Sequence, residues 1–278
     1  MIGPAPRGRH RRAAGTVGVL ALAIVASATC TKIPTNPASV FSLALDSLPG
    51  PSVVAGDTLR DTNGIATPLS GLAYNIQNQP LHTVRVQFIS LSPGQLGINS
   101  SNFAIGTPSG DSIVRVVADA DGLQSLPFNV PVVLKPTNLV HADSDSISTM
   151  TLSLTNPDSN VSVPLNIFLI HQPDTLGADS VTRSYIVHYQ IVYPASAAGG
   201  TGTPTDSTLP AYLIGGVGQP ARTDTTDGNG MGTRQVNFSV AQFAPKSQDS
   251  IVVLVTAAYR DSVVAGSPLR FVIHYTAP

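Results

Sequence analysis

The chain contains no glutamate, and all 16 of its acidic residues are aspartates. Lysine is almost absent as well, with three residues among 278. Because glutamate and lysine are strong helix formers, their scarcity removes the usual material of exposed helices. Valine, threonine, serine, glycine and proline are abundant instead, and this mixture favours short strands joined by turns. The composition therefore predicts an all-β protein.

Alternating apolar and polar residues predict seven short strands in each half of the chain. In the segment 83–88, three apolar residues alternate with Arg85 and Gln87, which is the pattern of a half-buried strand. Turn residues recur about every 8–12 residues, as in β-sandwiches. We therefore predict one sandwich over 40–136 and a second over 137–278. The Asp-Ser-Ile-Val segment at 111–114 recurs at 249–252, which indicates a diverged duplication.

Three further segments carry specific expectations. Five residues of one predicted strand alternate as an apolar and aromatic stripe, which predicts that they pack in the core: Tyr185, Val187, Tyr189, Ile191 and Tyr193. The stretch 97–105 is expected to form a single strand in the first half. The segment 194–204, rich in glycine, alanine and threonine, is of low complexity and predicts a mobile loop.

The first 29 residues have the features of an export signal. Four arginines within residues 7–12 precede an uncharged run from 13 to 29, and Cys30, the only cysteine, follows. The arrangement resembles a bacterial lipoprotein signal, in which the cysteine becomes an acylated N-terminus. An Ala-x-Ala site at 26–28 leaves open cleavage before Thr29, which would give a periplasmic or secreted protein. The third alternative is an uncleaved membrane anchor. The uncharged segment 13–29 has about the minimum length, roughly 17 residues, that a helix needs to span a bilayer.

We therefore expect 1–29 to be a signal peptide, Cys30 to carry the lipid, and 30–39 to be a tether. The expected location is the outer membrane or cell surface, and the membrane is the expected partner through this anchor. Beyond the leader, 11 basic residues stand against 16 aspartates. No basic stripe remains to attract phosphate, which argues against a nucleic-acid partner. A protein or cell-surface partner stays open.

The motifs that usually carry catalysis do not occur in this chain. A His-Glu-x-x-His metal motif needs glutamate, and neither a Gly-x-Ser-x-Gly elbow nor a phosphate-binding loop is present. We predict no catalytic residues, no metal ligands and no cofactor. The segment 224–230 invites a calcium interpretation, but its carboxylate spacing favours a plain turn. Asp57, Asp61 and Asn63 form a weaker ion candidate of the same kind.

Two segments carry the pattern of a known family. Residues 74–81 lead into a Val-x-Val-x-Phe strand at 84–88, with Asn75 and Asn78 at the turn, and residues 226–233 form a Thr-Asp-x-x-Gly type turn before a late strand. Both resemble the bacterial immunoglobulin-like repeats of invasin- and intimin-type surface proteins. The resemblance implies two tandem immunoglobulin-like sandwiches that serve as non-catalytic spacer, adhesion or binding modules. The alternative function is an accessory binding component of a secreted hydrolase or an outer-membrane transport system.

The repeated Asp-Ser-Ile-Val segment also predicts a binding face on the second domain. If Val114 and its alternate neighbours point inward, the alignment turns Val253 and Val255 outward. Three strands that lie side by side would then present valines flanked by two histidines, and large exposed apolar patches tend to be contact sites. The candidate binding residues are His188, Gln190, Val253, Val255, Val272 and His274.

Overall fold

The computed structural model describes residues 36–108, 111–143, 146–153, 155–156, 160–172, 179–239 and 248–276. Over these residues the chain forms two β-sandwiches, and the predicted all-β class is confirmed. The one helix among them is a short 3-10 turn, η2, at Pro204–Thr208. The expected signal peptide, Cys30 and the first part of the tether lie outside the described residues.

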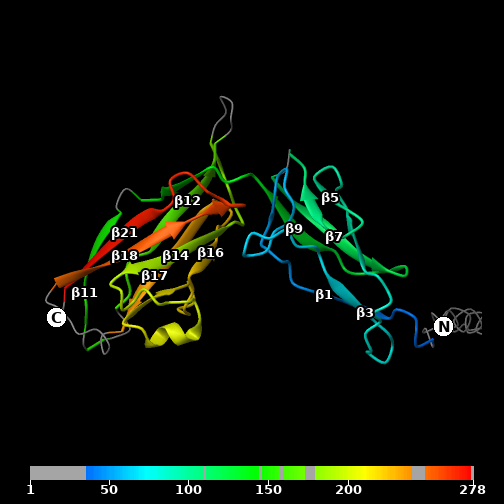
Figure 1. Ribbon diagram of the computed structural model, residues 1–278, viewed down its shortest axis with the longest axis horizontal. Coiled ribbons are helices and arrows are strands. Elements are labelled where there is room, and N and C mark those ends of the chain that lie inside the picture. The colour runs from blue at the N-terminus through cyan, green and yellow to red at the C-terminus, as the bar shows by residue number, and fades with distance from the viewer. Residues whose placement is uncertain are drawn as a thin grey trace, which may run out of the picture.

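The first domain consists of nine short strands around one core (Figure 1). Its main sheet has the order β2-β9-β7-β4, with β8 paired to β7, and the pairs β1–β3 and β5–β6 complete the sandwich. The strands are β1 (Ser42–Leu45), β2 (Val53–Val54), β3 (Gly71–Tyr74), β4 (Gln87–Ser90), β5 (Leu96–Ile98), β6 (Ala104–Gly106), β7 (Ser112–Ala120), β8 (Leu123–Gln124) and β9 (Phe128–Val133). The core is built largely from valine, alanine and leucine, so branched side chains fill the space between the layers.

The second domain is larger, and its described residues form two five-stranded sheets and the two-stranded β19–β20 hairpin. One sheet has the order β10-β12-β17-β15, with β13 paired to β12, and the other has the order β11-β21-β18-β14-β16. The strands are β10 (Asn138–His141), β11 (Ile147–Thr151), β12 (Leu165–His171), β13 (Ser180–Val181), β14 (Ile186–Tyr193), β15 (Ala211–Ile214), β16 (Thr223–Thr225), β17 (Met231–Phe238), β18 (Gln248–Thr256), β19 (Ala258–Tyr259), β20 (Ser262–Val263) and β21 (Leu269–Thr276). Tyr189 and Tyr275 are the largest fully buried side chains of its core.

The two domains share a topology around their last strands. In each, a short early strand runs parallel to the last strand: β2 beside β9 and β11 beside β21. In each, the penultimate long strand lies between the last strand and a middle one, with β7 between β9 and β4 and β18 between β21 and β14. This shared pairing agrees with the duplication that the repeated segment indicates.

The repeated Asp-Ser-Ile-Val segments nevertheless present opposite faces. Val114 is buried and Ile113 is 59% exposed, whereas Ile251 is fully buried and Val252 is only half-buried. Because side chains alternate along a strand, a shift of one residue turns the whole strand over. The second domain also has a bulge where β14 meets β18, between Ile191 and Tyr193. Sequence alignment of the two strands is therefore misleading about which side chains face out.

The bulge also limits the predicted tyrosine stripe. Val187, Tyr189 and Ile191 pack in the core as expected, and Tyr185 is partly buried against it. Tyr193, beyond the bulge, is 45% exposed. A bulge inserts an extra residue, so the alternation changes phase at that point.

One expectation about local structure is wrong, and the mobility expected of a second segment stays a prediction. The stretch 97–105 is not one strand: it ends β5, turns at Asn99–Asn102 and begins β6. The segment 194–204 is folded around the buried carboxylate of Asp206, which accepts hydrogen bonds from the backbone N–H groups of Thr201 (2.9 Å) and Gly202 (2.7 Å). A single buried acceptor thus organises a segment whose composition predicts mobility.

One five-residue turn recurs in both domains. Its first residue exchanges backbone hydrogen bonds with the fourth and fifth, and its fourth residue has a positive φ. The described residues contain it at 61–65, 75–79, 99–103, 215–219 and 227–231. In all but the 215–219 turn, an Asp or Asn side chain at the first position also accepts N–H bonds from the third and fifth residues. The predicted turn at 227–230 is confirmed, and Asp61 has the same role in the first domain.

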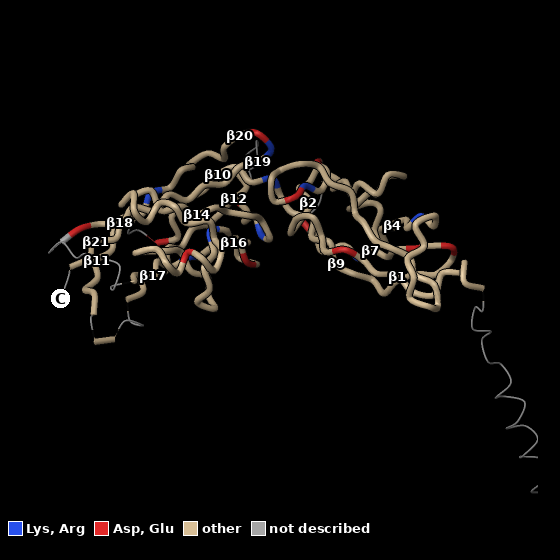
Figure 2. The backbone as a smooth tube through the Cα atoms, turned by 60° about the horizontal axis from the view of Figure 1, so that its bottom comes forward, with Lys and Arg blue, Asp and Glu red and all other residues tan. Residues whose placement is uncertain are grey.

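Figure 1 shows the two domains side by side along the longest axis of the molecule, with β3 near one end of this axis and β11 and β21 near the other. The chain passes between them through the short connection from β9 to β10. Figure 2 shows charged residues on both sides of the junction, near β2 of the first domain and near β19 and β20 of the second.

Candidate functional site

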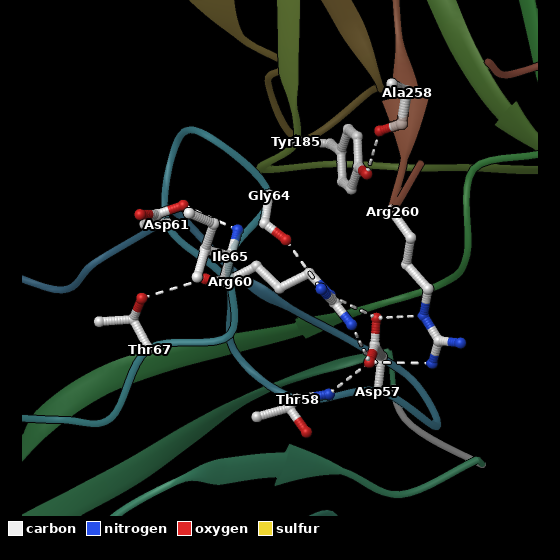
Figure 3. Close-up of polar contacts among 10 residues, drawn as sticks. All are labelled: Asp57, Thr58, Arg60, Asp61, Gly64, Ile65, Thr67, Tyr185, Ala258 and Arg260. Carbon is white, nitrogen blue, oxygen red and sulfur yellow. Dashed lines mark hydrogen bonds and ion pairs between the residues drawn. The ribbon is translucent and has the colours of Figure 1, made fainter. Parts of the chain in front are cut away.

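A cleft lies at the junction of the two domains. It has a volume of about 190 Å³ and is lined by the 51–64 segment of the first domain, by the start of β14, and by Ala258–Arg260. The 51–64 segment places Asp57 and Arg60 in this cleft and ends in the five-residue turn that begins at Asp61. Figure 3 shows the loop of the first domain facing the β19–β20 hairpin of the second.

Asp57 is the centre of the junction. Its side chain is 5% exposed, and its carboxylate accepts hydrogen bonds from Arg60 Nε (3.0 Å) and, across the domain boundary, from Arg260 Nε (3.1 Å) and Nη2 (3.0 Å). The backbone N–H of Thr58 adds a bond of 2.8 Å. Arg60 is itself fixed by donation from Nη1 to the carbonyl oxygen of Gly64 (2.7 Å). Figure 3 shows both guanidinium groups turned toward the one carboxylate.

The two arginines determine the charge state of Asp57. Burial alone acts to raise the pKa of the carboxyl group. The hydrogen bonds from Arg260, Arg60 and Thr58 outweigh burial and hold the pKa well below its usual range. Asp57 is therefore ionised at every physiological pH, and the ion pair across the junction persists with it.

Arg260 reaches Asp57 from a backbone conformation that arginine rarely adopts. It is the first of two residues that close the β19–β20 hairpin, and its φ is +55°. Two-residue hairpins with a positive φ only at this position normally carry glycine there, because a side chain is strained. The corresponding hairpin of the first domain, β7–β8, carries Asp121-Gly122 instead. The side chain of this arginine makes the ion pair with Asp57 across the domain boundary.

Two more contacts join the domains. The hydroxyl of Ser52 donates to the carbonyl oxygen of Ser184 (2.6 Å), and Ser184 is another non-glycine residue with a positive φ, at +50°. Arg183 pairs with Asp111 at 3.0 Å, with both side chains partly exposed. Together with Asp57–Arg260, these contacts hold the junction at three points.

The second domain contributes the other wall of the cleft. The hydroxyl of Tyr185 donates to the carbonyl oxygen of Ala258 (2.7 Å), which fixes the ring above the charged cluster (Figure 3). Burial raises the pKa of Tyr185 well above its usual range. Desolvation and the charge of Arg222 lower the pKa of His188, so the imidazole is neutral at neutral pH. Tyr259 lies under Lys135 (5.1 Å from ring centroid to Nζ) and close to Arg260.

The structure divides the predicted binding residues among different environments. His188 and Gln190 are exposed, as expected, but only His188 lines the cleft. Val253 and Val255 are fully buried in the core, so the expectation that they face outward is wrong. The strand is turned over relative to the repeat alignment, and Val252 and Leu254 face outward in their place.

The last strand completes this correction. Val272 is 7% exposed, so it is covered and not presented to solvent as expected. His274 is half-buried, and its Nδ1 lies 2.7 Å from the Ser250 hydroxyl. The six predicted residues therefore do not form one exposed apolar patch.

The ion candidates of the sequence are engaged in other bonds. Asp57 is held by two arginines, and the carboxylate of Asp61 accepts N–H bonds within its own turn. Among the described residues, no group of three or more His, Cys, Asp or Glu side chains is placed to hold a metal ion. The same part of the chain contains no helix long and apolar enough to cross a membrane.

Sequence reasoning missed the junction. It placed Asp57 in an ion candidate and gave no role to Arg60 or Arg260. The one local signal was the Tyr-Arg-Asp-Ser hairpin at 259–262, which lacks the glycine or asparagine that such a loop favours.

No protein-family model matches the chain, and no curated protein matches its sequence. Similar solved structures include the Yersinia pseudotuberculosis adhesin InvE (12% identity, TM-score 0.31, 84% of this chain and 58% of that one). Others are domains 4 and 5 of the S-layer protein SbsC (12%, 0.27, 86% and 100%) and human desmocollin-1 (10%, 0.23, 85% and 42%). The chain thus spans little more than half of the adhesin. At these identities and TM-scores the similarities carry no argument about function.

Proposed function

We propose that this chain is a non-catalytic, exported surface protein whose two sandwiches form a rigid spacer, anchored through a lipid on Cys30. The observation that carries the proposal is the junction, where a buried carboxylate is shared by one arginine from each domain. Free relative motion is the default for two domains joined by a short linker, unless their interface opposes it. Three polar links that include two strained residues oppose it here.

The positions of the chain ends support a spacer role. The first described residues and the last strand lie at opposite ends of the long axis (Figure 1). An anchor at the N-terminal side therefore holds the far end of the second domain away from the membrane. A stiff junction keeps that distance constant, which a flexible one would not.

Small-angle X-ray scattering of the purified protein tests the stiffness of the junction. A single elongated two-domain shape should fit the whole curve. Arg260→Gln removes the link across the junction and should raise the flexibility of the scattering particle, whereas Arg115→Gln, an exposed arginine on β7, should leave the curve unchanged. If the unaltered protein already scatters as two freely jointed bodies, the rigid-spacer proposal is wrong.

The anchor is tested separately. Cys30→Ser should move the protein from the membrane fraction to the soluble fraction, because acyl chains contribute about 0.8 kcal/mol per buried methylene. Intact mass of the mature protein should show a lipidated N-terminal cysteine. A mature N-terminus at Thr29 without lipid mass would favour the secreted form instead.

A further inference from the structure

The spacer role leaves the junction cleft unexplained. A rigid junction needs contact between the domains, yet these domains enclose about 190 Å³ between the 51–64 segment and the start of β14. This is below the roughly 300–1,000 Å³ typical of pockets for drug-sized ligands. The cleft therefore fits a small ligand, of the size of one ring.

The charges that line the cleft cancel. Arg60 and Arg260 bring two positive charges, and Asp57 and Asp61 bring two negative ones. Asp57 is satisfied by both arginines, and Asp61 by the N–H groups of its own turn (Figure 3). Because complementary interfaces match charge with charge, a cleft without excess charge favours a neutral ligand.

The remaining polar groups suit hydroxyl groups. Thr62 and Asn63 are exposed at the rim, and each can both donate and accept hydrogen bonds. His188 is neutral at neutral pH and so offers one donor and one acceptor. A sugar hydroxyl also both donates and accepts hydrogen bonds, whereas a simple cation or anion interacts with only one kind of partner.

Both domains contribute apolar side chains to the cleft, Pro51 and Val54 from the first domain and Tyr185 and Ile186 from the second. The ring of Tyr185 is held in place through its hydroxyl and lies beside Ile186. The chain contains no tryptophan, and the rings that line the cleft are those of Tyr185, Tyr259 and His188. Aromatic side chains offer a flat, rigid apolar wall at low entropic cost, against which the C–H face of a ring can pack.

We propose that the junction cleft binds one ring of a neutral saccharide, with Tyr185 as its wall and Thr62, Asn63 and His188 as hydroxyl partners. This site lies beyond the spacer function, and its failure would leave the spacer proposal intact. Because residues of both domains line the cleft, a bound ligand would contact both domains at the junction.

Amide chemical-shift titration of the isotope-labelled protein tests the site. The probes are methyl glucoside, methyl galactoside and N-acetylglucosamine, with galacturonate as the charged comparison and a short neutral peptide as the non-sugar comparison. At least one neutral sugar should shift amides within 51–64 and 185–188 in a saturable way. His188→Ala should weaken binding about tenfold, and Gln190→Ala, two residues along the same exposed face of β14 but outside the cleft, should not.

Three results would overturn the proposal. These are tighter binding of galacturonate or the peptide than of every neutral sugar, an equal loss in both variants, and no saturable shift with any neutral sugar. Asn63→Ala provides a second variant at an exposed position, so a folding defect in one variant does not decide the outcome.

Discussion

Replacing Asp57 with asparagine tests the central contact of the molecule. Asparagine keeps the shape of the side chain but removes the negative charge that two guanidinium groups share. Removing one partner from a buried ion pair costs about 3–5 kcal/mol. The two arginine side chains are 29% and 50% exposed, so water compensates part of the loss and we expect about 3 kcal/mol.

Thermal unfolding followed by calorimetry measures this loss. For a domain of about 100 residues, 3 kcal/mol lowers the melting temperature by more than about 10 °C. The first domain should carry the change, because Asp57, Thr58 and Arg60 all belong to it, and its transition should separate from that of the second domain. Asp121→Asn, at an exposed aspartate in the β7–β8 hairpin, is the matched control and should shift the melting temperature little.

The pH dependence of the same variant gives a second test. The folded pKa of Asp57 is lowered, so its stabilisation is fully present above the unfolded value of about 3.9 and is lost as pH falls toward the folded value. The stability difference between the protein and Asp57→Asn should therefore be constant from about pH 5 to 8 and shrink below about pH 4. Equal melting temperatures at pH 7, or a difference that grows on acidification, would refute the reasoning.

Two further pairs of variants test the corrected strand and the recurring turn. Val253→Thr buries a hydroxyl in the core and should lower the free energy of unfolding, measured with denaturant, by about 1–3 kcal/mol. Val252 is half-buried, so Val252→Thr should lower it clearly less. Equal losses would contradict the assigned faces. Gly230 and Gly218 occupy the same position of the turn with φ of +74° and +75°, but a Cβ on Gly230 would lie 2.8 Å from Val181 Cβ and one on Gly218 meets nothing within 4 Å. Gly230→Ala should therefore lower the unfolding free energy by more than Gly218→Ala, whose cost of about 1 kcal/mol comes from φ alone.

Composition and short patterns determined the class of this protein. Without glutamate and with little lysine, the chain lacks helix-forming surface, and its alternation of apolar residues predicts sheets with one buried face. The sequence also predicts turns of this kind. An Asp or Asn at the first position accepts hydrogen bonds from the backbone N–H groups of the residues two and four positions later, as Asp227 does. These features depend on neighbours in the sequence, so the sequence alone specifies them.

The tertiary structure decided everything that joins distant residues. Asp57 and Arg260 are 203 positions apart, and no local pattern connects them. The face that Val253 presents depends on how β18 pairs with β14 and β21, and the bulge that turns Tyr193 outward in β14 has no clear mark in the sequence. Asp206 organises its loop only because folding buries it. Pairing between strands and burial of single polar groups are long-range events, and for that reason the junction and its cleft emerge only from the folded chain.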